Sequence, residues 1–354
     1  MIDLKLQRHA LSALAAAALF GLSTPLAKLL LGELPPIALA GLLYLGSGAG
    51  LLAVRLVQHA AGRPAAARET PLARGDFPWL AGAVLSGGVI APVLLLWGLR
   101  GTDASAASLL LNLEGVLTTL IAAVLFREAI AGRIWLASLL MAVAGALLSW
   151  QPGAGRGSSL QFLAVVGACL FWGLDNNLTR KVSGSDPAMI AMIKGLGAGT
   201  FNLTIAILLG MALPVPQVLA SALILGFLSY GVSLVLFIYA LRHLGSARAG
   251  AHFSTAPFIG AGVAVVALGE PLTPLFVAAL LIMAAATWLV LSENHGHGHT
   301  HENQAHSHRH VHDAHHRHDH PGDIGPEPHA HWHEHAPIAH THPHLPDLHH
   351  RHRH

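Results

Sequence analysis

Six residues that could bind an ion or a polar solute lie inside long apolar stretches of the sequence. They are Glu114, Asn112, Asp175, Asn176, Lys194 and His252. Carboxylates and imidazoles can bind a cation or carry a proton, whereas a lysine can neutralise a carboxylate or hold an anionic group. Charges deep inside an apolar segment are costly, so they usually face a cavity or pair with each other. These residues are the candidate substrate- or ion-binding site.

The same residues also admit a purely structural interpretation. Lys194 could form an ion pair with Glu114 or Asp175 that holds helices together, and His252 could be a hydrogen-bonded packing residue. In the functional interpretation, Glu114 and Asp175 bind a cation or cycle a proton, because a desolvated carboxylate exchanges protons nearer neutral pH than an exposed one. The sequence leaves both interpretations open.

A second group of candidate ligands fills the C-terminal stretch. All but four of the 27 histidines lie between His295 and His354, mixed with Asp, Glu, Pro and Arg. Neutral imidazole is the commonest protein ligand for metals such as Zn, Ni, Co and Cu. The His-x-His spacing puts successive rings on one side of an extended chain, so that two or three can chelate one ion. The candidate metal ligands are His297, His299, His301, His308, His310, His312, His331, His333 and His335.

We expect this stretch to be disordered, because it has few apolar residues. Three interpretations other than metal binding also apply to it. A purification tag would be a short uninterrupted run of histidine, whereas this stretch is long and mixed. A solvated tail without function and a pH sensor that gains charge as imidazoles titrate, at about pH 6.5, also stay open. We prefer binding of Ni, Co or Zn by the tail, and expect no other cofactor.

The rest of the chain has the composition of a membrane protein. Apolar residues make up 53% of the sequence and charged residues 11%. Apolar runs of about 18 to 25 residues can cross roughly 30 Å of hydrocarbon as helices. This predicts an all-α polytopic membrane protein with ten transmembrane helices. The runs are about 10–31, 36–57, 77–98, 104–126, 133–150, 160–180, 187–209, 217–241, 247–268 and 272–291.

The basic residues predict how the chain is oriented. If the N-terminus is cytoplasmic, most Lys and Arg residues of the connections lie inside, and only Arg100 and Arg156 lie clearly outside. This is the distribution that cytoplasmic loops usually show. Ten spans then place both termini in the cytoplasm, and we expect a multi-pass protein of the inner (plasma) membrane.

The chain contains a five-span unit twice. Residues 99–128 align without gaps on 241–270, and residues 20–28 align on 172–180. An odd number of spans makes the second unit enter the membrane upside down, as in transporters with alternating access. The predicted units are 1–150, 151–293 and a tail at 294–354.

The alignment of the two units does not repeat the charges inside the spans. An Arg and a Glu 28 residues apart occur in both copies, at the ends of the longer aligned stretch. The candidate site residues, in contrast, are aligned with uncharged ones: Glu114 with Ala256, Asp175 with Ser23, and His252 with Leu110. This difference indicates a site specialised in this chain.

Several of these motifs resemble a known family. The stretch "GLRGTDASAASLLLNLEGVLTTLIAAVLFREAI" resembles the fourth-helix signature of EamA-type transporters, in the drug/metabolite transporter superfamily, although Gly115 stands where a Pro is frequent. "AAALFGLSTPLAK" and "ACLFWGLDNNLTRK" resemble the opening helices of the two EamA repeats. The resemblance covers about 10–291 and leaves out the tail. It implies ten helices, cytoplasmic termini and movement of small solutes, often exported and often coupled to a proton or ion gradient.

The sequence therefore predicts a secondary-active transporter, and no enzyme, because no nucleophile–base arrangement or nucleotide motif is present. The preferred hypothesis is export by alternating access through Glu114, Asp175 and His252, with Ni, Co or Zn as substrate or regulator. The alternative is export of a small organic metabolite or amino acid, with Lys194 holding a substrate carboxylate and the tail sensing metal or pH.

A different class of function is a membrane-anchored metal store or sensor. The inverted repeat argues against it, because an anchor needs one helix rather than ten. The expected partners are a small solute or metal ion, the lipid bilayer and a proton or ion gradient, with no nucleic acid. The sequence leaves open whether the protein forms a homodimer.

Overall fold

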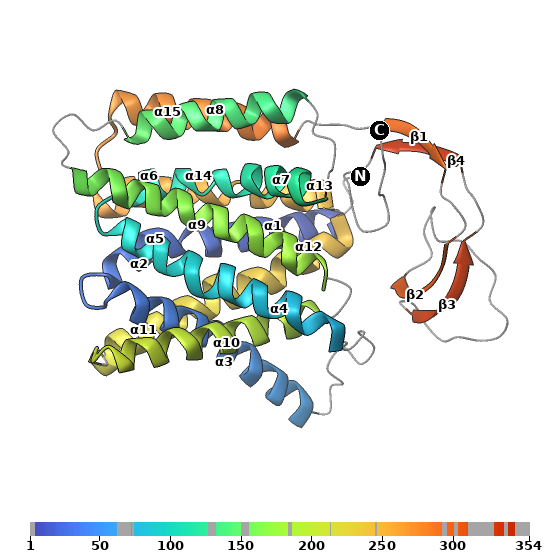
Figure 1. Ribbon diagram of the computed structural model, residues 1–354, viewed down its shortest axis with the longest axis horizontal. Coiled ribbons are helices and arrows are strands. Elements are labelled where there is room, and N and C mark those ends of the chain that lie inside the picture. Colours follow the sequence, from blue (N-terminus) through green and yellow to red (C-terminus); the bar gives the residue numbers. More distant parts are fainter. Residues whose placement is uncertain are drawn as a thin grey trace.

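The computed structural model consists of long helices followed by short strands (Figure 1). It describes residues 4–61, 72, 74–126, 132–149, 156–182, 186–212, 214–244, 246–291, 296–300, 304–310, 329–335 and 339–343. The helices follow the ten predicted segments in order, several of them as two or more consecutive pieces. Their bounds are α1 (Leu4–Gly21) and α2 (Ser23–Leu30); α3 (Pro36–Ala60); η1 (Arg74–Asp76), α4 (Phe77–Ala83), η2 (Val84–Ile90) and α5 (Ala91–Leu99); α6 (Ala104–Leu110) and α7 (Leu113–Phe126); α8 (Gly132–Ser149); α9 (Arg156–Arg180); α10 (Pro187–Leu208); α11 (Pro216–Gly226), η3 (Phe227–Val232) and α12 (Ser233–Leu244); α13 (Ser246–Phe253) and α14 (Ala256–Leu268); and α15 (Pro274–Leu291).

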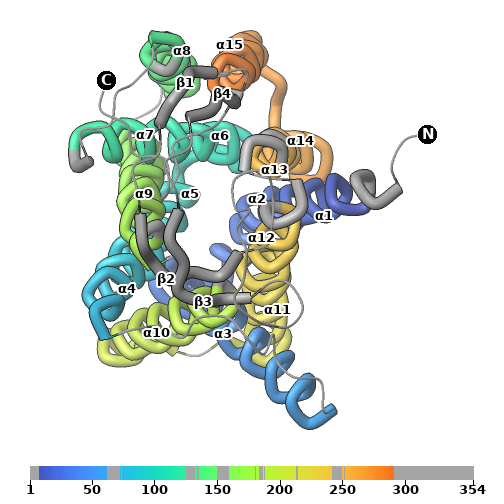
Figure 2. The backbone as a smooth tube through the Cα atoms, turned by 90° about the vertical axis from the view of Figure 1, so that its right-hand side faces the viewer, coloured from blue at the N-terminus to red at the C-terminus, as the bar shows by residue number. Residues whose placement is uncertain are grey.

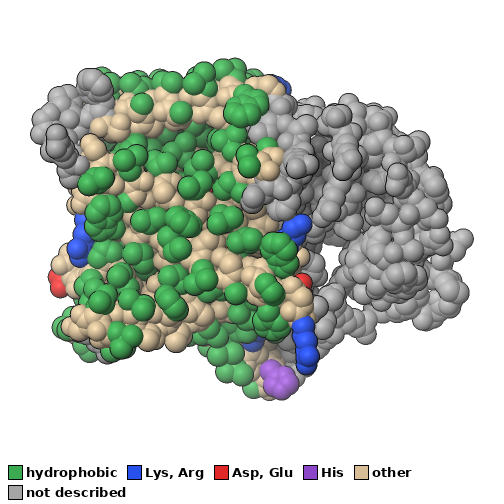
Figure 3. Space-filling model, viewed as in Figure 1, with side chains coloured by type: hydrophobic (Ala, Val, Ile, Leu, Met, Phe, Trp, Pro, Cys, Tyr) green, Lys and Arg blue, Asp and Glu red, His purple; other side chains and the backbone are tan. Residues whose placement is uncertain are grey.

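Seven helical segments of the described chain are long and apolar enough to cross a membrane. Three further apolar helices are shorter, at Trp135–Ser149, Ala256–Leu268 and Pro274–Val290. The face of the molecule in Figure 3 is covered by hydrophobic side chains, while charged ones gather at its two ends. The chain is thus an all-α polytopic membrane protein, and ten crossings, which require the three shorter helices, stay a prediction.

The packing of the helices follows the repeat. Three pairs join equivalent spans of the two units: α3 with α10, α8 with α15, and α6 with α14. The contact of α5 with α9 has its counterpart in the contact of α12 with α1. Figure 2 shows α7 and α9 at one side of the bundle and α1 and α12 at the other.

Interruptions of the helices also recur at equivalent positions. The third span contains the π-helical segment η2 and the eighth contains the π-helical segment η3. The fourth span is broken between α6 and α7, and the ninth between α13 and α14. Each unit therefore carries one π segment and one break inside consecutive spans, which is a frequent feature of helices that bind solutes at mid-membrane.

The break in the fourth span has a local cause. Leu111 and Asn112 donate their N–H groups to carbonyls three residues back, at 3.2 and 3.1 Å, in place of four. The side-chain amide of Asn112 also donates to the carbonyl oxygen of Leu109 at 2.9 Å. An Asn side chain that competes for backbone groups in this way favours the end of a helix.

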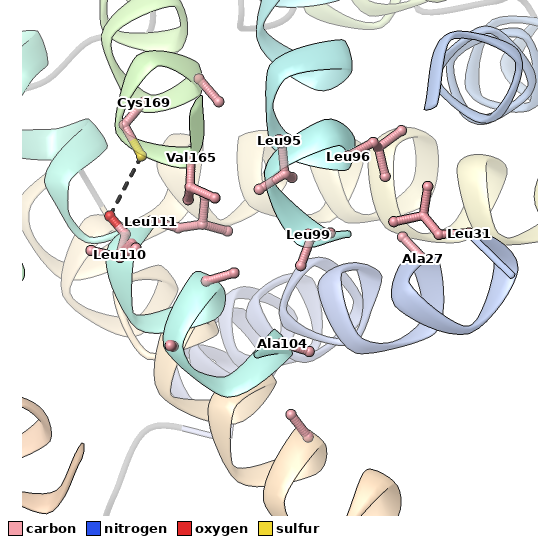
Figure 4. Packing of buried hydrophobic residues seen from close by; sticks show 14 of the residues in the cluster. Ala27, Leu31, Leu95, Leu96, Leu99, Ala104, Leu110, Leu111, Val165 and Cys169 are labelled. Atoms are coloured by element: carbon pink, nitrogen blue, oxygen red, sulfur yellow. Dashed lines mark hydrogen bonds between the residues drawn. The ribbon is translucent and has the colours of Figure 1, made fainter. Parts of the chain in front are cut away.

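Leucine and alanine side chains fill the space between the helices. Figure 4 shows Leu95, Leu96 and Leu99 of α5 packed among neighbouring helices, and all three are nearly inaccessible. Cys169 of α9 is buried beside them and donates to the carbonyl oxygen of Leu110 at 3.5 Å. It is a free thiol that packs as a small apolar residue.

Charged side chains hold the corner between α5 and α6. Lys28 Nζ donates to the carbonyl oxygens of Leu99 and Thr102, at 2.6 and 2.5 Å. Glu270, which follows α14, accepts the first two N–H groups of α6 at 2.7 Å each. A carboxylate satisfies a helix N-terminus well, because these N–H groups have no partner within the helix. Burial raises the pKa of the nearby Asp103 carboxyl above its usual range.

The tail contains four described strands in two antiparallel pairs. They are β1 (Gly296–Thr300), β2 (Gln304–His310), β3 (His329–His335) and β4 (Ala339–Pro343), with β1 paired to β4 and β2 to β3. These strands cover short stretches of the tail, and the expected disorder of the tail as a whole stays a prediction. Alternation with a period of two residues suits a strand, and pairing satisfies backbone groups without an apolar core.

Glycines let α3 and α10 cross at close range. A Cβ at Gly195 would lie 2.6 Å from the backbone nitrogen of Gly48 and 2.9 Å from the carbonyl oxygen of Tyr44. Both neighbours are backbone atoms of α3, so they cannot turn aside as the end of a side chain would. Small residues at such crossings provide the close packing on which helix association in membranes depends.

We predict that Gly195→Val separates α3 from α10 and lowers stability by about 1–3 kcal/mol, the usual cost of overpacking. Gly262→Val is the matched control, because a Cβ at Gly262 of α14 meets nothing within 4 Å. Thermal unfolding of the detergent-solubilised proteins measures the difference. Equal midpoints for the two variants would contradict the close crossing.

Candidate substrate-binding site

An ion pair inside the bundle joins α9 to α10. Lys194 Nζ donates to both carboxylate oxygens of Asp175, at 2.6 and 2.8 Å, and to Thr179 Oγ1 at 3.2 Å. Thr179 Oγ1 in turn donates to Asp175 at 2.9 Å. Only 8% of the Asp175 side chain and 17% of the Lys194 side chain are exposed, so little water can compete for these bonds. Lys194 therefore neutralises Asp175, and whether this pair serves structure alone or also transport stays open.

Asp175 reaches this position because Gly87 has no side chain. A Cβ at Gly87 would collide with the Asp175 carboxylate. Gly87 lies in η2, and its carbonyl oxygen accepts hydrogen bonds from Tyr44 Oη at 2.6 Å and from Trp172 Nε1 at 2.9 Å. The π segment thus holds three chemically different side chains around one short piece of backbone.

Glu114 has different surroundings. It lies in the first turn of α7, where the positive end of the helix dipole favours a carboxylate. Asn176 Nδ2 donates to Glu114 Oε1 at 2.9 Å and to Thr118 Oγ1 at 3.2 Å. Within the described part of the chain, no Lys or Arg lies within salt-bridge distance of Glu114, although Lys194 is within electrostatic range.

These residues form one polar cluster, which we define as Glu114, Asp175, Asn176 and Lys194 with Thr118 and Thr179. The cluster lies where α7, α9 and α10 come together. With Asp175 and Lys194 neutralising each other, it carries one unneutralised carboxylate. A carboxylate in this position can bind a proton or another cation.

Two of the six predicted residues do not join this cluster. Asn112, in the break between α6 and α7, donates to the carbonyl oxygen of Leu109, and its side-chain oxygen accepts a 3.5 Å bond from Thr287 of α15. His252 lies at the end of α13, half-buried, with its carbonyl oxygen accepting a 2.6 Å bond from Thr255 Oγ1. Neither residue contacts Glu114 in the described bonds, so a direct role for either one stays a prediction.

Aromatic side chains extend from this region across the bundle, and the sequence analysis does not single them out. The ring of Tyr44 lies 5.5 Å from that of Tyr230, which lies 5.9 Å from Phe20. Phe20 lies 5.5 Å from Phe253, which lies 4.4 Å from Phe237. We call these five residues the aromatic row. They come from five separate elements, so no spacing in the sequence could have revealed them.

The predicted metal ligands fall on the tail. His301 and His312 lie outside the described residues. The other seven lie on β1, β2 and β3, where the register places His297 opposite His342, His299 opposite His340, and His308 opposite His331. Among the residues with described side chains, no group of three or more His, Cys, Asp or Glu could hold a metal ion.

Comparison with known proteins matches both units separately. The EamA-like transporter family matches residues 7–150 and again residues 160–292. The chain belongs to the EamA-like transporter family. The matched residues include all six candidate residues inside the spans and stop before the histidine tail.

One relative of this EamA-like transporter supports the assignment, and one solved structure shares its fold. A protein named as an uncharacterized transporter, from Methanothermobacter thermautotrophicus, is 31% identical over 274 residues, which is 74% of this chain and 79% of the relative. A solved crystal structure superimposes with a TM-score of 0.58 at 18% identity, over 80% of this chain and 96% of that one. The second likeness shows the fold alone.

The ion pair of this EamA-like transporter predicts a thermodynamic coupling. Asp175→Asn or Lys194→Met alone should destabilise the protein by about 3–5 kcal/mol, because each leaves a buried charge without its partner. The double variant should recover most of that loss, since it leaves no charge behind. Thermal unfolding of the four proteins in detergent measures the coupling, and additive losses in the double variant would contradict it.

Proposed function

We propose that the protein is a secondary-active transporter that moves a small organic solute by alternating access, with Glu114 as the group that exchanges a proton for the solute. The observation that carries this proposal is the unequal pairing of the two carboxylates. Asp175 is neutralised by Lys194, whereas Glu114 is bonded to the neutral amide of Asn176. A membrane-embedded carboxylate without a positive partner is typical of proton and ion pathways.

The geometry supports an organic solute over a divalent metal ion at this site. Transition metals are usually held by several imidazole, thiolate or carboxylate ligands. Glu114 and Asp175 are the carboxylates of the cluster, and Asp175 is already bound to Lys194. Because Lys194 is bound to Asp175, it is also less suited to hold a substrate carboxylate, which is the role it has in the alternative hypothesis.

The repeat supports alternating access. The π segments η2 and η3 and the breaks at α6–α7 and α13–α14 stand at equivalent positions of two units that we expect to be inverted. In inverted-repeat transporters the two units exchange conformations around a site near the midplane. We further propose export as the direction, the inner membrane as the location, and cytoplasmic positions for both termini.

Transport by purified protein in liposomes tests this proposal. We would impose a pH gradient and measure uptake of an alkylamine, a neutral amino acid, a dicarboxylate, and Ni, Co and Zn ions. An organic solute should accumulate, and Glu114→Gln should reduce that accumulation by about 30-fold or more, because the binding charge is lost. The control is Glu33→Gln, the same change at an exposed position between spans.

Metal accumulation that requires Glu114, with no organic solute moving above empty liposomes, would favour the metal hypothesis instead. Equal transport by the wild type and Glu114→Gln would show that Glu114 has no part in coupling. Either result would contradict the proposed mechanism.

The tail supports a second, separate proposal, which is binding of Ni, Co or Zn ions outside the membrane. Residues two apart in a strand share a face, and directly opposed residues share it too. The register of β2 and β3 therefore places three opposed histidine pairs on one face, and two adjacent pairs among them are His306 with His333 and His308 with His331. Four imidazoles can complete the tetrahedral shell of Zn.

We predict that the full chain binds several Ni or Zn ions and that replacing these four histidines by Asn removes at least one of them. Equilibrium dialysis with metal analysis counts the bound ions. Glu114→Gln should leave the count unchanged, which separates the tail from the membrane site. An unchanged count in the four-histidine variant would refute the assignment to β2 and β3.

A further inference from the structure

The side of the polar cluster that faces the rest of the bundle is aromatic. Tyr44 donates to the carbonyl oxygen of Gly87, which packs against the Asp175 carboxylate, and the ring of Tyr44 lies 5.5 Å from that of Tyr230. Glu114 also lies within electrostatic range of both tyrosine hydroxyls. Glu114 belongs to α7, which packs against α8 and α9, whereas Tyr230 belongs to η3, which packs against α1, α3, α11 and α12. Glu114 and Tyr230 therefore belong to different units and to elements with different packing neighbours.

Both tyrosine hydroxyls are already engaged. The hydroxyl of Tyr44 donates to the carbonyl oxygen of Gly87 at 2.6 Å, and Tyr230 is hydrogen-bonded to the side chain of Ser23. Because both hydroxyls are engaged, the group with which each tyrosine can contact a solute is its aromatic ring. Tyr230, Phe20 and Phe253 are half-buried residues, and Glu114 is also half-buried.

The charges around Glu114 decide which solutes fit. A solute carboxylate would meet the unneutralised Glu114, while the nearby cation, Lys194, has its Nζ bound by both oxygens of Asp175 and by Thr179. A hydrated metal ion would find too few ligands in the cluster. An ammonium group satisfies both neighbours, because a carboxylate attracts its charge and aromatic rings attract cations through their negative faces.

We propose that this site recognises an organic cation, meaning a solute with an ammonium group, apolar substituents and no carboxylate. Glu114 binds the charge, and the aromatic row, above all Tyr230, contacts the apolar substituents. The inference rests on the proposed function and narrows its substrate class. It excludes amino acids, which carry a carboxylate beside their ammonium group.

Binding to the full chain in detergent tests this inference without requiring transport. The probes for isothermal titration calorimetry are benzyltrimethylammonium, phenylalanine and benzoate, which share a phenyl ring and differ in charge. Benzyltrimethylammonium should bind more tightly than the other two. Glu114→Gln should weaken its binding by about 30-fold or more, whereas Glu33→Gln should leave it unchanged.

Two substitutions of one residue separate ring chemistry from folding. Tyr230→Phe keeps the ring and should bind nearly as the wild type does, while Tyr230→Leu should weaken binding by about three- to tenfold, the contribution of a ring to a bound cation. A merely structural role for the Ser23 hydrogen bond would make Tyr230→Phe as damaging as Tyr230→Leu. That result would overturn the assignment of Tyr230.

Tighter binding of phenylalanine or benzoate, or binding of benzyltrimethylammonium that survives Glu114→Gln, would overturn the proposed substrate class. The proposed function fails separately. If liposomes show Glu114-dependent transport of a neutral amino acid, the transporter proposal stands and the organic-cation inference falls. If benzyltrimethylammonium binds through Glu114 but no solute is transported, the binding site stands and the transporter proposal falls.

Discussion

A charge inside a bilayer must find its partners within the protein, and the contact between Asp175 and Lys194 is the clearest case in this chain. It forms because η2 brings Gly87, which has no side chain, against Asp175. The same piece of backbone receives Tyr44 and Trp172, so the third, sixth and second spans are fixed around it. Unpaired lone pairs and charges are expensive in hydrocarbon. Because Asp175 is already paired with Lys194, Glu114 is the carboxylate of the polar cluster that can bind a proton or another cation.

The sequence predicts much of the scaffold and part of the site. Apolar run lengths place the helices to within a few residues, since the hydrocarbon thickness sets them. Asp175, Lys194 and Glu114 stand out because charge is rare inside such runs. Asn112 lies only two residues before Glu114 in the sequence, but it is in the break between α6 and α7 and its side chain bonds to Leu109. The actual partner, Asn176, comes from another span, and packing between distant segments decides such contacts.

The two units share a backbone plan but differ in chemistry. Interruptions recur in both, and they depend on Gly, Pro and Asn residues that shape the main chain. The carboxylates of the polar cluster belong to the fourth and sixth spans, and their aligned positions carry Ala256 and Ser23. Ser23 is nevertheless hydrogen-bonded to Tyr230, a member of the aromatic row. The carboxylates of the polar cluster and the rings of the aromatic row thus each come from both units.

The π segments also set the rotational phase of their spans. A π turn holds one residue more than an α turn, and each helical residue rotates the chain by about 100°. Residues before and after η2 therefore face different neighbours than they would in an uninterrupted helix. Leu80 precedes η2 and Leu95, Leu96 and Leu99 follow it, and all four are buried. Deleting one residue from η2 would make the helix more regular. It would also rotate the residues after η2 relative to those before it, so that Leu95, Leu96 and Leu99 would turn away from the core. In this span a single-residue deletion is more disruptive than most substitutions, because it changes the orientation of every side chain beyond it.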